Sequence, residues 1–252
     1  MTRPIRAALA AALHLAAAPG AARAADAEAK KAKDLAVQAS LEEFRKAPKV
    51  SDAEKTEAVQ ILARQKDKRL LDALIKLLAD PNPLARLETI KVIGSYEKSP
   101  VAAQALVGAA KAVRKEPDVQ VACFKALGRI QDWSATPAVI DFFNDNDSAV
   151  ARAAIAAAGE IRNPAVVPEL IDLLEDRRNR RAGRLSRSSE GPAGANALHA
   201  EARQTLQAIT GETKHKTAED WDAYWKIYGA RVTEQLKKED KEARERAQKE
   251  EG

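Results

Sequence analysis

Apolar residues recur at helical spacing through much of the chain, and the pattern is clearest between residues 144 and 176. The first stripe in this stretch recurs at offsets of four, four and three residues: Val150, Ala154, Ala158 and Ile161. This spacing places the stripe on one face of a helix. Asp147 and Ser148 precede it and can cap it, because their side-chain oxygens accept free backbone N–H groups. The pattern predicts a helix from Ala149 to Ile161.

A second helix is predicted directly after Asn163-Pro164, which breaks the first run. Its apolar stripe consists of Val167, Leu170, Ile171 and Leu174. Pro168 lacks an N–H donor, so we expect it to bend this helix or delay its start. The two helices form a hairpin that cannot bury both apolar faces alone, and therefore needs neighbours.

Fainter copies of the hairpin lie on both sides. With Gly159 as a marker, the equivalent positions are spaced by 31, 34, 31 and 48 residues: Ala63, Gly94, Gly128, Gly159 and Gln207. A small residue stands five positions before each marker: Ala58, Thr89, Cys123, Ala154 and Ala202. A period in this range with two helices per unit predicts an all-α solenoid of about five helical hairpins.

Two segments of this hairpin resemble the HEAT repeat: Asp147 to Val150 before the marker glycine, and the stretch around Asn163-Pro164 and Val167-Pro168. The resemblance is closest to the short bacterial PBS-lyase HEAT-like form. The resemblance covers about residues 35–211. It implies a right-handed α-α superhelix that binds another protein along its concave face. Tetratricopeptide repeats have a similar length, but their Trp-Leu-Gly and Tyr pattern is absent.

In HEAT arrays the second helix of each unit lines the concave face. Positions three residues before and one residue after the markers form a mildly basic ladder in the first three units, and the resemblance makes them the candidate partner-binding residues: Arg64, Lys91, Lys125 and Arg129. The alternative is that these four side chains only face solvent, as charged residues on a helix surface ordinarily do.

The N-terminus has the order of a secretory signal peptide, predicted over residues 1–24. Arg3 and Arg6 precede an apolar stretch at 7–18, and small residues follow it. We expect cleavage after Ala24, or after Ala27, and export to the periplasm or the exterior; an uncleaved helix is the alternative. Twelve apolar residues are too few to span a bilayer, and no later stretch is long enough. A charged lead-in at 25–34 follows.

Composition and charge narrow these expectations only slightly. The chain is 45% hydrophobic but only 4% aromatic, and small side chains suit close helix packing. Loss of residues 1–24 removes three of the 42 basic residues and no acidic one, so the net charge falls from +5 to +2 and indicates no particular partner. Cys123 is expected to fill the core, because a single cysteine cannot form an internal disulfide.

A basic insertion loop is predicted at 177–196, inside the array at 35–211. Six arginines fall within eleven positions of it: Arg177, Arg178, Arg180, Arg181, Arg184 and Arg187. One interpretation is a solvated, self-repelling linker. The other is an arm that binds an acidic protein, a lipid headgroup, a polysaccharide or a nucleic acid. No aromatic residue interrupts the cluster, which disfavours nucleic acid.

The array is expected to end at Gly211, and an aromatic capping helix is predicted at 212–229. Thr217 and Asp220 have capping spacing, and four large residues follow on one face: Trp221, Tyr224, Trp225 and Tyr228. We interpret them as a lid over the last unit, because the end of a solenoid leaves an apolar face uncovered; a partner-binding patch is the alternative. Residues 230–252 are predicted to be a charged tail, helical or disordered, with little to pack.

Candidate chemistry is sparse. The histidines are His14, His199 and His215, and the sequence has no phosphate-loop glycine pattern, nucleophile elbow or metal-type cysteine spacing. We therefore predict no catalytic residues, metal or cofactor. The predicted function is a non-catalytic scaffold with a protein partner. The alternative is a protein that binds an anionic polymer or membrane surface through the arginine loop. An enzyme with an unrecognised site is a third hypothesis.

Overall fold

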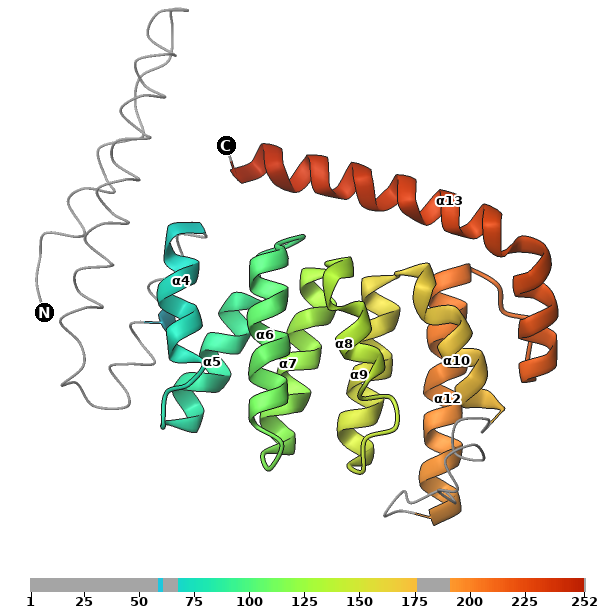
Figure 1. Cartoon of the computed structure of the whole chain (residues 1–252), viewed down its shortest axis with the longest axis horizontal. Coiled ribbons are helices and arrows are strands. Elements are labelled where there is room, and N and C mark those ends of the chain that lie inside the picture. Colours follow the sequence, from blue (N-terminus) through green and yellow to red (C-terminus); the bar gives the residue numbers. More distant parts are fainter. Residues whose placement is uncertain (1–58, 61–67, 176–190, 252) are drawn as a thin grey trace, which may run out of the picture. The chain divides into compact units, whose positions relative to one another are not determined.

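The computed structural model describes residues 59–60, 68–175 and 191–251 (Figure 1). The chain divides into two compact units, Met1–Ala73 and Leu74–Gly252. In the described part of the first unit, Val59, Leu70 and Leu71 are buried. Throughout the described ranges every regular element is a helix, so the all-α prediction is confirmed.

From α4 to α10 the helices follow one another with short connections. Their bounds are α4 Lys68–Leu77, α5 Pro83–Ile93, α6 Pro100–Ala112, α7 Pro117–Ile130, η1 Trp133–Ala135, α8 Thr136–Ile140, α9 Ser148–Ile161, η2 Pro164–Val166, α10 Val167–Leu174, α12 Gly191–Thr210 and α13 Ala218–Glu251.

In the second unit, α5, α7, α9 and α12 form one layer, in which α7 contacts α5 and α9, and α9 contacts α12 (Figure 1). Helices α6, α8 and α10 pack against this layer. Four of the five predicted small residues are buried in it: Thr89, Cys123, Ala154 and Ala202. The fifth, Ala58, lies outside the described residues. At Gly94 a Cβ would lie 2.9 Å from Cβ of Ala126, so glycine is needed for this close approach of α5 and α7.

The hairpin that is clearest in the sequence folds as its caps indicate. The Asp147 carboxylate accepts hydrogen bonds from the backbone N–H groups of Ala149 and Val150, and α9 begins at Ser148. Asn163 then caps η2, and the regular helix α10 starts only at Val167. The expected delay near Pro168 is present as this 3-10 turn.

The predicted insertion loop at 177–196 is too long at its C-terminal end, because α12 already begins at Gly191. Its six arginines lie outside the described residues. Further along α12, the Thr205 hydroxyl donates to the backbone carbonyl of Ile155 at 3.1 Å, which fixes α12 against α9.

Helix α13 is continuous from Ala218 to Glu251, and it joins the predicted capping helix to the predicted charged tail. The helical alternative for the tail is therefore correct. The helix bends, and its second part runs along the turns that follow α5, α7 and α9 (Figure 1). Gly229 is its only glycine, and a glycine is a common site for a helix bend. The expectation that the tail has little to pack is wrong, because its side chains pair with Lys98, Asp132 and Arg162.

Candidate functional site

The predicted basic residues that the structure describes lie on one face of α5 and α7. Lys91, Lys125 and Arg129 are exposed, and we call them the cationic row. The Lys91 ammonium lies 3.7 Å from the carboxylate of Glu88, one turn earlier in α5. Arg64, the fourth residue of the predicted ladder, lies outside the described residues.

Long side chains of this layer extend over two of the three marker glycines. The Arg129 guanidinium of α7 lies over Gly94 of α5, because its Nη2 would be 3.0 Å from a Cβ built there. The Glu160 carboxylate of α9 lies over Gly128 in the same way. Arg129 therefore bridges two helices of the layer. The row of basic side chains ends at α9, where Glu160 takes the position equivalent to Arg129.

An exposed apolar residue extends the face that carries the cationic row. Leu84 is 66% exposed and stands two helical turns before Lys91, so the two residues share one face of α5. A face with both an apolar anchor and cations suits a protein partner better than a purely polyanionic ligand.

The aromatic residues of α13 fall into a buried and a half-exposed group. Trp221 is 0% exposed, and its ring stands edge-on to His215 at 5.2 Å between centroids. Tyr228 remains 41% exposed and carries the Arg231 guanidinium 5.5 Å from its ring centre. Tyr224 and Trp225 are half-buried. Helix α13 contacts α10 and η2. The burial of Trp221 is what a lid over the last hairpin requires.

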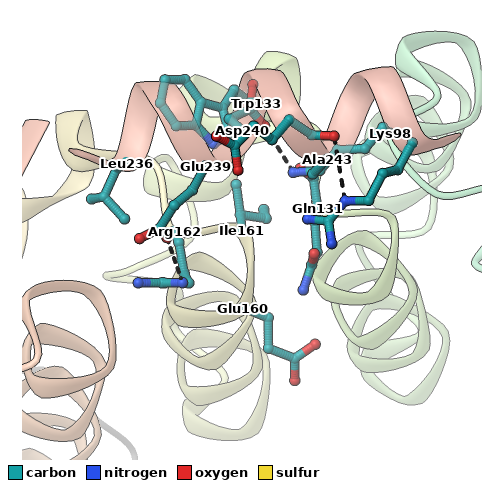
Figure 2. A pocket seen from close by; sticks show the side chains of 12 residues that line it. Lys98, Gln131, Trp133, Glu160, Ile161, Arg162, Leu236, Glu239, Asp240 and Ala243 are labelled. Atoms are coloured by element: carbon teal, nitrogen blue, oxygen red, sulfur yellow. Dashed lines mark hydrogen bonds and ion pairs between the residues drawn. The ribbon is translucent and has the colours of Figure 1, made fainter. Parts of the chain in front are cut away.

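Three consecutive turns of the array contact the second part of α13, residues 230–251, which we call the tail segment. Figure 2 shows the contacts made by Lys98 and Arg162. After α5, Lys98 Nζ donates to Asp240 Oδ1 at 2.8 Å. After α7, Asp132 Oδ2 lies 3.0 Å from Arg244 Nη1. After α9, Arg162 Nη1 lies 3.0 Å from Glu239 Oε2. We call these three turns the turn edge.

The turn edge presents equivalent positions from successive units. Lys98, Gln131 and Arg162 each have a left-handed backbone, with φ of 53°, 54° and 53°. The turns are also linked to one another, because the Lys98 backbone N–H donates to the Ile130 carbonyl and its ammonium donates to the Gln131 carbonyl. Lys98 thus ties two turns and the tail segment together.

Asp132 is the most deeply buried charge at this edge, with a side chain that is 1% exposed. Its Oδ1 accepts the backbone N–H of Ser134, while its Oδ2 faces Arg244 as an ion pair without an aligned hydrogen bond. Partial burial lowers the pKa of Arg244, but the hydrogen bond to Asp240 and the charge of Asp132 raise that pKa above its ordinary value. Arg244 therefore stays charged and compensates both carboxylates.

A cavity of about 330 Å³ lies between the tail segment and the turn edge. Trp133, Ile161 and Leu236 supply its apolar wall, and charged side chains surround them (Figure 2). Two of its three cations, Lys98 and Arg162, are engaged by Asp240 and Glu239, and the third, Arg246, is exposed. The cavity is part of the docking of α13.

The sequence contained a signal for this docking that charge composition obscures. Small or apolar residues continue through the tail segment at offsets of four, seven and four: Val232, Leu236, Ala243 and Ala247. Asp240 and Arg244 adjoin this stripe, so they face the array. The remote partners Lys98 and Asp132 could not be assigned from spacing within one helix.

Catalytic or metal chemistry finds no support in the described ranges. They contain no group of three or more His, Cys, Asp or Glu side chains placed to hold a metal ion. Cys123 is buried, and burial raises the pKa of its thiol to about 12, so it remains a protonated core residue. No described helix has both the length and the apolar character needed to cross a membrane.

Comparison with known proteins supports the repeat architecture. The family model described as HEAT repeats matches residues 39–116 and 111–186, which together exceed half of the chain. No curated protein matches the chain significantly.

Proposed function

The chain belongs to the HEAT-repeat family, and we propose that it is an exported, non-catalytic scaffold that binds a protein partner through the cationic row. HEAT repeats generally mediate protein–protein interaction. The HEAT resemblance assigns the face with Lys91, Lys125 and Arg129 to the concave side. The observation that carries the proposal is the combination of this row with exposed Leu84 on the same face of α5.

The proposed partner presents an acidic surface with an apolar contact. Lys91 and Lys125 occupy equivalent positions in successive units, so they can contact one extended acidic segment. Leu84 can then bury its side chain against an apolar residue of the partner, which adds binding free energy that salt does not screen.

Charge reversal tests the cationic row. The variant Lys91→Glu/Lys125→Glu should lower partner capture from the native envelope fraction by roughly tenfold, because like charges across an interface are costly. The variant Arg114→Glu/Lys115→Glu changes the net charge equally at exposed positions between α6 and α7, and it should capture the partner as the parent does. Equal capture by the parent and by the variant reversed at Lys91 and Lys125 would contradict the proposal that the cationic row binds the partner.

A second candidate function is binding of an anionic polymer or membrane surface through the arginines at 177–187. Six guanidinium groups within eleven positions favour it, because each can release counterions from a polyanion. Replacement of all six by glutamine keeps the segment length. It should lower the salt concentration for elution from heparin and flatten the salt dependence of binding to anionic vesicles. An unchanged salt slope would identify the segment as a linker.

Export is supported by the order of charged, apolar and small residues in 1–24. We expect the protein isolated from its native host to begin at Ala25 and to be found in the envelope or the medium. Intact mass spectrometry of each cell fraction tests this, and a full-length cytoplasmic product would overturn it.

A further inference from the structure

We propose that the tail segment of α13 is a strap that fixes the spacing of three consecutive repeats. A solenoid is held together mainly by contacts between neighbouring units, so its units can shift relative to one another. The tail segment adds contacts that cross from unit to unit. Asp240, Arg244 and Glu239 attach to the turns after α5, α7 and α9 respectively.

The placement of these contacts distinguishes a strap from a simple end cap. A lid needs to contact only the last hairpin, and α13 contacts α10 and η2 there. The tail segment instead extends back along the turn edge to Lys98, 142 residues away in sequence. A continuous helix attached at three turns holds those turns at set distances, because helix length per residue is fixed.

The ion pairs between the tail segment and the turn edge form only when their side chains are held at defined distances. Lys98 and Asp240 side chains are only 10% and 11% exposed, and Arg244 serves both Asp240 and the buried Asp132. Partly buried charges are weakly screened and costly to leave unpaired. A change in the spacing of α5 and α7 would separate at least one of these pairs, so the strap resists it.

The attachment is tested by reversing two charges of the tail segment. Asp240→Lys/Arg244→Glu places like charges opposite Lys98 and Asp132 while the charge pair within α13 is kept. The matched control is Lys241→Glu/Glu245→Lys, one residue further along, where both parent side chains are exposed. Neither variant changes the net charge. Amide hydrogen exchange in 236–249 should become roughly tenfold faster in the first variant and stay unchanged in the control.

Repeat spacing is read separately with spin labels on α5 and α9. Lys91→Cys and Arg152→Cys supply exposed labelling sites in a Cys123→Ala background. The strap requires that the distance distribution between the labels broadens when Asp240 and Arg244 are reversed, and that it does not in the control. Faster exchange with an unchanged distribution would overturn the strap and leave the tail segment as a passive cover.

A milder variant covers the case in which the double reversal prevents folding. Asp240→Asn keeps the side-chain shape but removes the charge opposite Lys98 and Arg244. It should broaden the distribution between the labels to a smaller extent. A folded Asp240→Asn protein with parental exchange and parental distances would likewise overturn the proposal.

Discussion

The two parts of helix α13 are attached to the array by different physical means, although they belong to one continuous helix. Before Gly229, the contact is aromatic and centred on Trp221, which is fully buried. After Gly229, Leu236 is the one buried residue among the described side chains of 230–249, and ion pairs to the turn edge supply most of the specific contacts.

The two attachments differ in how strongly they hold α13 and in how precisely they position it. Burial of a tryptophan contributes a large free energy that depends little on orientation over a few degrees. Charge-assisted hydrogen bonds contribute less when they are partly exposed, but they require defined distances. The first part of α13 therefore holds the helix on the array, and the tail segment determines where it lies.

Removal of the aromatic anchor has the largest expected effect. Trp221→Ala should lower the free energy of unfolding by about 3–5 kcal/mol, because it leaves a cavity where a fully buried indole stood. Urea denaturation followed by circular dichroism measures the change. Tyr228→Ala is the matched control, since this half-exposed ring should contribute less than about 1 kcal/mol. Equal losses in the two variants would show that Trp221 is not the anchor.

Removal of the cation beside Asp132 should have an intermediate effect. Arg244→Ala leaves a carboxylate that is 1% exposed without its ion-pair partner, and we expect a loss of about 1–3 kcal/mol in the free energy of unfolding. Arg246→Ala removes an exposed arginine from the same helix and should cost about 0.5 kcal/mol or less. If both variants unfold at the same urea concentration, the tail segment is held by Leu236 rather than by its charges.

The architecture followed from the sequence because its determinants are local and repeated. Each hairpin needs small residues where helices approach closely, and Thr89, Cys123 and Ala154 recur at that position for this reason. The start of α9 was also predictable, since Asp147 caps the N–H groups that follow it directly. The start of α12 at Gly191 was missed because glycine and proline there suggested a loop.

The docking of the tail segment was not predictable in the same way. Its apolar content is low, so the many charged residues obscured the short stripe of Val232, Leu236, Ala243 and Ala247. The attachment depends instead on Lys98, Asp132 and Arg162, which come from three separate units and meet the tail only in the folded chain. The cationic row was found from repeat register, since equivalent positions in successive units fall on one face.

The smallest effect is expected at the start of α13, in the part of the helix that Trp221 anchors. The Asp220 carboxylate accepts the backbone N–H of Thr217 at 3.2 Å, and the Thr217 hydroxyl accepts the backbone N–H of Asp220 at 3.2 Å. The backbone N–H of Thr217, followed by its hydroxyl, lowers the pKa of Asp220 below its ordinary value of 3.8. A lowered pKa stabilises the folded state above that ordinary value, and this contribution is lost as the pH falls through the lowered pKa. Asp220→Asn should therefore reduce the difference in melting temperature between about pH 6 and about pH 2.5, and Thr217→Val should reduce it by a smaller amount. A parental pH dependence in Asp220→Asn would mean that the Asp220 carboxylate does not cap the helix, and that the Thr217 hydroxyl and the aromatic contacts determine where α13 begins.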